Sequence, residues 1–494
     1  MTKRLGLLDW LQAGVTLVFF LFMFQGKGSH GVFLLGLLLL PVLRFSFDLK
    51  FRQAQIERYV GWAKQLMTAP NRPTVALFAW VAAPFLILLL GNGGTLTTQD
   101  NLPVKLTVSQ LLTQGTLTLN QKFSEGCEGA ANHYFVMCRD GKVLSKYPLG
   151  MATFLLPISG VAWLLGADLE NDRVMLRLEK LTASLIAAAC LCLFFLVACR
   201  IGNFSGAVFA TILLGLGSSL NSIVGQALWT QGGVTLALLV IVAGEFLRTK
   251  ETETPWVLLQ GLAMSVSIAC RLSSGVLVLV FGLWLAFTDF RRSIKVALVA
   301  IGGYLPWAMI HYYWFGSPFG PQLGLSGANY WTANPWPSFL GLLVSPSHGM
   351  FVYQPWVFVT VVLTLVSSRA RGELKSLGQG PAGWVATVLL AFLAQLVLLS
   401  FWTQWHGGYS WGSRLMAPVL PLLGLLSVPV LGYVWRTTKG FGLALGIVSL
   451  WMHLGCVYSK ATLWYVNVLH SGNESLLWSW QNAPFLYPFW RGAL

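Results

Sequence analysis

An isolated carboxylate, Asp100 in the segment TTQDNLP, is the first residue whose type and position could do chemistry. It follows an apolar stretch, and no other acid occurs between Glu57 and Glu125. A carboxylate held at the edge of an apolar region can act as a general base on an acceptor hydroxyl group. The alternative is structural, because Asp followed by Asn-Leu-Pro can also cap the start of a helix. Asp100 is therefore a candidate catalytic base, and the helix cap stays open as its alternative.

Two cations lie beside apolar segments. Lys146, in DGKVLSKYPLG, could neutralise a phosphate, or its side chain could reach the headgroups of membrane lipids. Arg271, in SIACRLSSG, lies between two apolar segments, where an unpaired cation is costly and an ionisable group is functional by default. The alternative for Arg271 is an arginine that pairs with backbone carbonyl groups at a break between helices. Both residues are candidates for phosphate binding.

Two further segments, SPSHGMFVYQP and WTQWHGGYSWGSRLMAP, combine histidine, arginine and aromatic residues with glycine. Glycine lets the backbone approach a ligand closely. Flat aromatic rings suit sugars, and arginine suits phosphate oxygens. Aromatic residues at the membrane interface explain many of the 22 tryptophans, but they do not explain glycines interleaved with aromatics around a histidine and an arginine. The candidate ligand-binding residues are His348, His406, Tyr409, Trp411 and Arg414.

Apolar helices must position these side chains. Of the 494 residues, 55% are hydrophobic and 10% are charged, whereas a soluble protein is about 25% charged. Apolar stretches long enough to cross a hydrocarbon core of about 30 Å recur along the chain, and the short alternating segments of a β-barrel are absent from the sequence. We predict an all-α polytopic membrane protein of about thirteen spans, at 9–25, 31–46, 74–91, 178–200, 203–219, 228–246, 255–270, 273–288, 296–315, 351–368, 384–402, 416–435 and 441–458. The pair 255–270 and 273–288 could instead be re-entrant.

The distribution of positive charge predicts the orientation. With the N-terminus in the cytoplasm, 19 of the 32 Lys and Arg residues fall in short cytoplasmic segments, and most of the formal net charge of +15 reflects topology. The apolar segment 148–166 could also span by length, but RRSIK and RARGELK would then lie outside. We therefore expect a helix on the outer membrane surface there.

This topology predicts three parts of the chain. They are an N-terminal hairpin with a cytoplasmic amphipathic linker (1–73), a transmembrane core (74–458) and an outer tail (459–494), and the core includes a long outer loop at 92–177. Cys127 and Cys138 lie in that loop, on the oxidising side of a bacterial membrane, where a disulfide between them is one of two open possibilities.

Several catalytic and nucleotide-binding motifs are absent from the sequence, and their absence narrows the classes of enzyme that the chain could belong to. The sequence has no phosphate-binding loop for nucleotides, no HExxH or GxSxG motif and no acidic metal cluster. Chemistry at the outer face without a nucleotide needs a donor that is already in the membrane, and a polyprenyl-phosphate sugar meets that description. We expect no nucleic-acid partner and no cofactor, although a divalent metal is not excluded.

The order of these features resembles the C-type (GT-C) membrane glycosyltransferases, in the branch of the protein mannosyltransferases and the lipid A aminoarabinose transferases. The resemblance rests on TTQDNLP after a core span, on SKYPLGMATFLLPISGVAWLLG and DRVMLRLEKLTASLIAAA, and on GLAMSVSIACRLSSG. SPSHGMFVYQP and WHGGYSWGSRLMAPVLPLL look like segments of bacterial membrane proteins assigned to this group. Family members often carry a second acid beside the first, where this chain has Asn101.

The resemblance implies a GT-C-like core and an enzyme that transfers a hexosyl or pentosyl group at the outer face of a bacterial inner membrane. Asp100 would be the catalytic carboxylate, with Lys146 and Arg271 near the donor phosphate. The acceptor would be a lipid, a glycan or a protein. Two alternatives stay open: a flippase or transporter of lipid-linked glycans, and a scaffold with this fold that has lost catalysis.

Overall fold

The computed structural model describes residues 85–86, 89–90, 98, 100–123, 126–321, 331–332, 334–408, 410–458, 468 and 472–486. The chain divides into two compact units, Met1–Gly94 and Thr95–Leu494, and nearly all described residues belong to the second. The predicted spans 9–25 and 31–46 lie outside the described residues, as do the linker 48–73 and almost all of 74–91.

Helices make up most of the second unit. Before the long helices come α5 (Leu102–Gln114), η1 (Asn120–Lys122), α6 (Cys127–Ala130), strands β1 (Val136–Arg139) and β2 (Lys142–Ser145), and α7 (Ala152–Leu164). The middle of the chain forms α8 (Asp172–Ile201), α9 (Phe204–Leu216), η2 (Leu220–Val224), α10 (Thr230–Leu247), α11 (Glu253–Cys270), η3 (Leu272–Ser274), α12 (Gly275–Thr288) and α13 (Phe290–Phe315). The last part forms α15 (Trp336–Val344), α16 (Met350–Tyr353), α17 (Pro355–Val366), α18 (Ser368–Glu373), η5 (Leu374–Gln379), α19 (Trp384–Ser400), η6 (Arg414–Met416), α20 (Leu420–Thr437), α21 (Lys439–Tyr458), η8 (Glu474–Trp478) and η9 (Trp480–Asn482).

Within the described residues, four helices are long and apolar enough to cross a membrane: α8, α10, α13 and α20. A fifth span results if α18–η5 and α19, which meet at a bend of 104°, count as one. The chain is thus an integral membrane protein of mainly helical structure, while the total of about thirteen spans stays a prediction. The predicted span 351–368 is divided between α16 and α17, because Pro355 has no amide N–H and begins a new helix.

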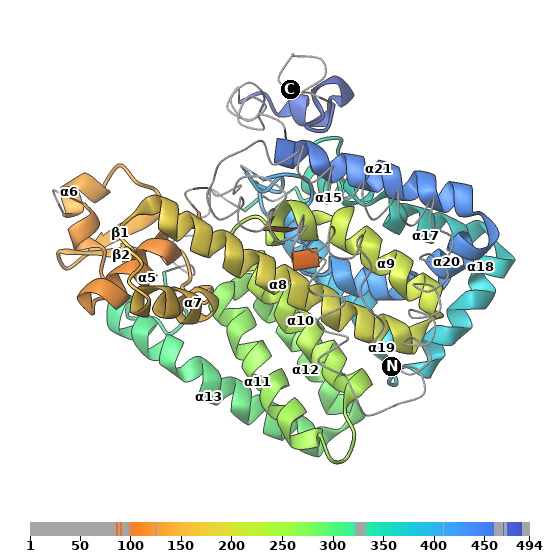
Figure 1. The fold of residues 1–494 in the computed structure, drawn as a ribbon, viewed down its shortest axis with the longest axis horizontal. Helices are drawn as coiled ribbons and strands as arrows, with labels where there is room; N and C mark the ends of the chain where they lie inside the picture. Colours follow the sequence, from red (N-terminus) through yellow and green to blue (C-terminus); the bar gives the residue numbers. More distant parts are fainter. Residues whose placement is uncertain are drawn as a thin grey trace, which may run out of the picture. The chain divides into compact units, whose positions relative to one another are not determined.

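Helix α8 is the longest helix among the described residues, with 30 residues. It packs against α10 and α9, while α11 packs between α10 and α13, and α20 packs on α9. Figure 1 shows α10 to α13 as neighbouring helices, with α5, α7 and the β-hairpin near the N-terminal end of α8. Helix α13 is an outer helix whose apolar window is only 6% buried, as expected of a surface that faces lipid.

The segment 148–166 forms a helix that is too short to span. Helix α7 has 13 residues, which at 1.5 Å per residue gives a length of about 20 Å. Leu164 and Leu165 at its end are 78% and 83% exposed. The length agrees with the prediction that this segment does not cross the membrane, and its position on the outer surface stays a prediction.

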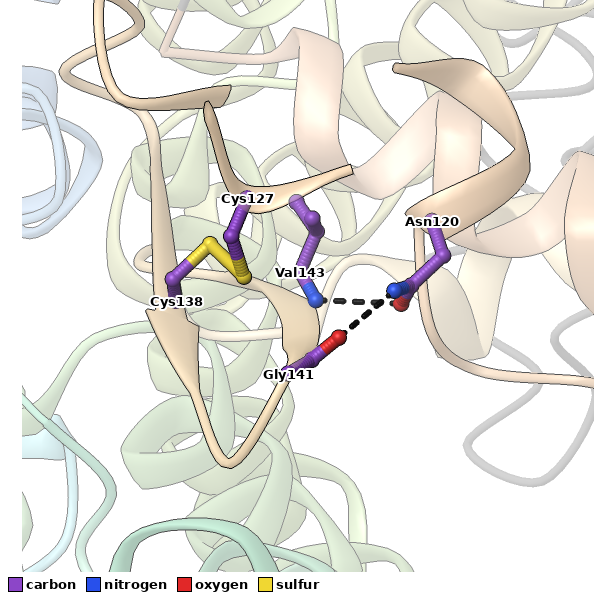
Figure 2. The surroundings of a disulfide bond; sticks show 5 residues. All are labelled: Asn120, Cys127, Cys138, Gly141 and Val143. Atoms are coloured by element: carbon purple, nitrogen blue, oxygen red, sulfur yellow. Dashed lines mark hydrogen bonds between the residues drawn. A yellow bond between two sulfur atoms is a disulfide. The ribbon is translucent and has the colours of Figure 1, made fainter. Parts of the chain in front are cut away.

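The predicted outer loop contains a β-hairpin that sequence analysis did not predict. An Asp140-Gly141 turn, with φ of +51° and +72°, joins β1 to β2 in an antiparallel hairpin. The Cys127–Cys138 disulfide, open in the sequence analysis, is formed and ties α6 to β1 (Figure 2). The Asn120 side chain accepts a hydrogen bond from the Val143 N–H and donates one to the Gly141 carbonyl oxygen (Figure 2). This hairpin positions Tyr134, just before β1, and Tyr147, just after β2.

Candidate active site

Asp100 is the centre of the candidate site. The Tyr147 hydroxyl donates a hydrogen bond to its Oδ1 at 2.7 Å, and the Tyr134 hydroxyl donates to the same oxygen at 2.9 Å. Arg414 Nη1 lies 3.2 Å from Oδ2 and forms an ion pair with it. The helix-cap alternative fails, because α5 begins after Asn101 and no side chain caps it. The Asp100 carboxylate is therefore held by side chains that lie far from it in the sequence.

The β-hairpin brings both tyrosines to Asp100. Tyr134 lies just before β1 and Tyr147 just after β2, so that the antiparallel pairing returns the chain to the same place. The Lys146 N–H donates to the Phe135 carbonyl oxygen at 3.1 Å and extends this pairing beyond the strands. The two hydroxyl groups consequently converge on one carboxylate oxygen.

Arg414 lies at the end of a glycine-rich loop, residues 404–416. Gly407, Gly408 and Gly412 have φ of +76°, +67° and +69°, a conformation that side-chain-bearing residues rarely adopt. A Cβ at Gly407 would lie 3.2 Å from Arg414 Nε, so the backbone passes close beneath the guanidinium group. The guanidinium group also lies over the Trp229 ring, with its central carbon 4.3 Å from the ring centroid. The glycines that sequence analysis singled out thus shape the surroundings of Arg414.

Arg271 reaches the site through a close backbone contact. It lies between α11 and η3, and its Nε donates a hydrogen bond to Ser273 Oγ at 2.8 Å. Beside it, the Gly150 N–H donates to the Ala269 carbonyl oxygen, and a Cβ on Gly150 would lie 2.3 Å from the Ala269 carbonyl carbon. Only glycine fits there, so the segment after Lys146 docks directly on the break that carries Arg271.

The charges of these groups act on one another. Burial raises the pKa of the Asp100 carboxyl, but Arg414 and the hydrogen bonds from Tyr147 and Tyr134 outweigh it, and the pKa lies below its usual value. Burial and the charge of Asp100 raise the pKa of both tyrosines, which therefore stay protonated as donors. Burial and the charge of Arg414 lower the pKa of Arg271 to about 10, and Arg271 remains a cation at neutral pH.

Two histidines lie beside the arginine. His406 Nδ1 accepts a hydrogen bond from the Gly408 N–H, and burial together with Arg414 lowers the pKa of His406 to about 4. At neutral pH His406 is uncharged and carries its proton on Nε2. Burial lowers the pKa of His348 to about 3, and its Nε2 donates to the Ser410 carbonyl oxygen at 3.2 Å. Their rings lie 6.1 Å apart, with His348 the more deeply buried.

The predicted residues do not all lie at one place. Asp100, Arg271, Arg414 and His406 form the site. Lys146 is a half-buried residue adjacent in sequence to Tyr147, and its ammonium group has no hydrogen-bond or ion-pair partner among the described residues. Trp411 is buried and donates from its indole to the Met452 carbonyl oxygen, so it anchors the loop to α21. Tyr409 lies outside the described residues.

Three residues of the site were not predicted: Tyr134, Tyr147 and Trp229. Tyr147 follows the singled-out Lys146, and the Asp-Gly turn between two short apolar segments would have signalled the hairpin that presents it. Trp229 lies in ALWTQGG and carries no local sign of a contact with an arginine 185 positions later.

A metal site would need several His, Cys, Asp or Glu side chains close together in the part of the chain that the structure describes. No group of three or more His, Cys, Asp or Glu side chains in that part could hold a metal ion. The expectation of no cofactor, with a divalent metal not excluded, stays a prediction.

Comparison with known proteins gives a fold likeness only. No family model matches the chain, and no curated protein matches it. It is similar to a solved structure, the crystal structure of ArnT from Cupriavidus metallidurans bound to undecaprenyl phosphate. The sequence identity is 13%, the TM-score is 0.48, and the match covers 83% of this chain and 75% of that one. The activity of this chain must therefore be argued from its own residues.

Proposed function

We propose that this protein is a membrane-embedded glycosyltransferase that moves a sugar from a polyprenyl-phosphate donor to an acceptor at the outer face of a bacterial inner membrane. One observation carries the proposal: a carboxylate, Asp100, forms an ion pair with Arg414 beside a second arginine, Arg271. A general base and a cationic site for a leaving phosphate are the two groups that this reaction needs.

The cations would stabilise the leaving group. Arg271 makes a single side-chain hydrogen bond within the described residues, to Ser273, which leaves most of its five N–H donors for a ligand. Negative charge grows on the phosphate as the bond from the sugar C1 to the phosphate oxygen breaks. Fixed cations in a site shielded from water stabilise that charge without further reorganisation. In this role Arg271 and Arg414 would bind the phosphate oxygens, and Lys146 would add a third charge.

Asp100 would accept the acceptor's proton. Its carboxylate has about four acceptor positions. The two tyrosines fill those of Oδ1, and Arg414 fills one on Oδ2, so one position on Oδ2 stays open. The Asp100 side chain is 24% exposed, enough for an acceptor to reach it. The acceptor oxygen would attack the sugar C1, its proton would pass to Oδ2, and the polyprenyl phosphate would leave with inversion at C1.

Arg414 links the two halves of this mechanism. While it pairs with Asp100 it lowers the pKa of that carboxyl, which makes Asp100 a weak base. A donor phosphate would compete for the same guanidinium group. When Arg414 turns toward the phosphate, the pKa of Asp100 rises and its basicity increases. Donor binding would thus switch on the base, and the donor would bind before the acceptor.

The sugar pocket would lie on the glycine-rich loop. His406 is uncharged and offers an Nε2–H to a sugar hydroxyl, close to the guanidinium group of Arg414. Tyr409 remains a proposed contact. Trp411 and His348 would act by holding the loop in place. The acceptor would be a lipid, a glycan or a protein, and the reaction would need no nucleotide.

The lipid that copurifies with the protein tests this proposal. We expect mass spectrometry of the wild-type extract to find a polyprenyl phosphate or its monosaccharide, and much less of it in the Arg271→Gln variant. Arg139→Gln is the matched control, because Arg139 is an exposed arginine of the hairpin. A long lipid-linked glycan would favour a flippase. An extract of wild type without any polyprenyl lipid would contradict the proposal.

A further inference from the structure

A buried ion pair lies behind the candidate site. Lys105 on α5 and Glu179 on α8 approach to 2.7 Å between Nζ and Oε2, and their side chains are 6% and 0% exposed. The other carboxylate oxygen of Glu179, Oε1, accepts a hydrogen bond from the Leu228 backbone N–H at 3.2 Å. One carboxylate thus joins α5, α8 and the residues that precede α10.

The neighbouring residue on α8 binds the same segment. Lys180 Nζ donates to the Gly225 carbonyl oxygen and to Gln226 Oε1, both at 2.9 Å. Residues 225–229 connect the π-helical turn η2 to α10, so their backbone lacks regular helical hydrogen bonds. Glu179 and Lys180 therefore supply an acceptor for the Leu228 N–H and a donor for the Gly225 carbonyl oxygen, two backbone groups of a buried connection between helices.

This connection ends at the contact with Arg414. Trp229 follows Leu228 directly, and its buried ring lies against the guanidinium group that pairs with Asp100. Asp100 in turn precedes α5, the helix that carries Lys105. These contacts link α5 to α8 and α8 to the segment that carries Trp229. Trp229 contacts Arg414, and Arg414 pairs with Asp100 just before α5.

We propose that Glu179 is a positioning residue: by holding the Leu228 N–H, it fixes the Trp229 ring against Arg414 and so sets the direction of that guanidinium group. The inference rests on the proposed function for its effect on catalysis, but its effect on Trp229 is independent of activity. The alternative is an ion pair that only joins α5 to α8, and buried ion pairs are often replaced by apolar side chains with little loss of stability.

Two double variants separate these roles, because both remove the ion pair. Lys105→Met/Glu179→Gln keeps an amide oxygen that can accept from the Leu228 N–H. Lys105→Met/Glu179→Leu removes that acceptor together with both charges of the ion pair. The full-length protein is labelled with 5-fluorotryptophan, and Trp229→Phe identifies the ¹⁹F resonance of Trp229. Transfer from a synthetic short-chain polyprenyl-phosphate monosaccharide gives kcat and the donor KM.

We expect the Gln double variant to keep the Trp229 resonance and a kcat within about threefold of wild type. The Leu double variant should shift that resonance and lower kcat at least tenfold, since displacements of about 1 Å can cost that much and more. An unchanged resonance in the Leu variant, or equal effects of both doubles, would overturn the proposal. If wild type shows no transfer, the resonance alone still decides whether Glu179 positions Trp229.

A second pair of variants, at Trp229, tests the proposal even if the variants of Glu179 fail to fold. Trp229→Leu removes the aromatic face beside Arg414, and Trp229→Phe retains one. We expect Trp229→Leu to lose kcat at least tenfold and Trp229→Phe to recover most of it. Wild-type kcat in Trp229→Leu would show that this contact does not direct Arg414, and the proposed role of Glu179 would fall with it.

Discussion

Removing the Tyr147 hydroxyl tests how the site controls its base. Tyr147 is one of three donors on Asp100, and its hydrogen bond is the shortest, at 2.7 Å. The Tyr147→Phe variant keeps the ring in place and deletes only this donor. Because the hydrogen bond stabilises the ionised carboxylate, its loss should raise the pKa of Asp100.

The size of that change follows from the burial of Asp100. A hydrogen bond to a charged group contributes about 1.5–3 kcal/mol. Asp100 is 24% exposed, and water partly replaces the lost donor, so the lower value applies. About 1.4 kcal/mol corresponds to one pKa unit. The base is active when ionised, so the rate falls as the pH drops through the pKa of Asp100. The variant should therefore lose activity at a pH about one unit higher than wild type, with a near-normal rate at neutral pH.

The assay is kcat for transfer from a synthetic polyprenyl-phosphate sugar, measured from about pH 3 to pH 8. Tyr134→Phe should give a smaller shift, because Tyr134 is 50% exposed and its hydrogen bond is longer. Tyr312→Phe, at an exposed tyrosine of α13, is the matched control and should give none. An acidic limb that stays in place or moves to lower pH in Tyr147→Phe would refute the reasoning.

Two further predictions concern how the site is held. Gly150→Ala should destabilise the protein by about 1–3 kcal/mol and lower its Tm, because the new Cβ would collide with the Ala269 backbone; Gly160→Ala on α7, which faces open space, should not lower it. Replacing Cys127 and Cys138 together by Ser should cost about 3 kcal/mol for a loop of this length. The hairpin should then be cut faster in limited proteolysis. An unchanged rate of cleavage would contradict the prediction that the disulfide stabilises the hairpin.

Sequence analysis singled out the charged groups of the candidate site, but it did not predict how they are arranged. Asp100, Arg271 and Arg414 stood out because ionisable residues are rare in a chain that is only 10% charged. Their partners are ordinary residues: Tyr147 and Trp229 matter through contacts that the fold creates, and neither lies in a motif. Local patterns could not place a tryptophan beside an arginine far away in the chain.

The helices show the same division between local pattern and fold. Apolar length located α8, α10, α13 and α20, because hydrophobicity over about 20 residues is a strong local signal. The helices with internal breaks were harder to delimit. Helix α9 ends at Leu216, before the predicted end of the span 203–219, and Pro355 divides the predicted span 351–368 between two helices. The hairpin was missed because its strands have only four residues each.

Transfer by the Asp100→Asn variant tests the central claim most directly. The change keeps the shape of the side chain and removes its ability to take a proton, which typically costs 10²–10⁴-fold in general-base catalysis. Asp140→Asn is the matched control, since Asp140 is an exposed acid of the same predicted outer loop. We predict that Asp100→Asn folds normally, still copurifies with polyprenyl lipid and transfers sugar at least about a hundredfold more slowly than Asp140→Asn. Equal transfer rates in the two variants would contradict the account.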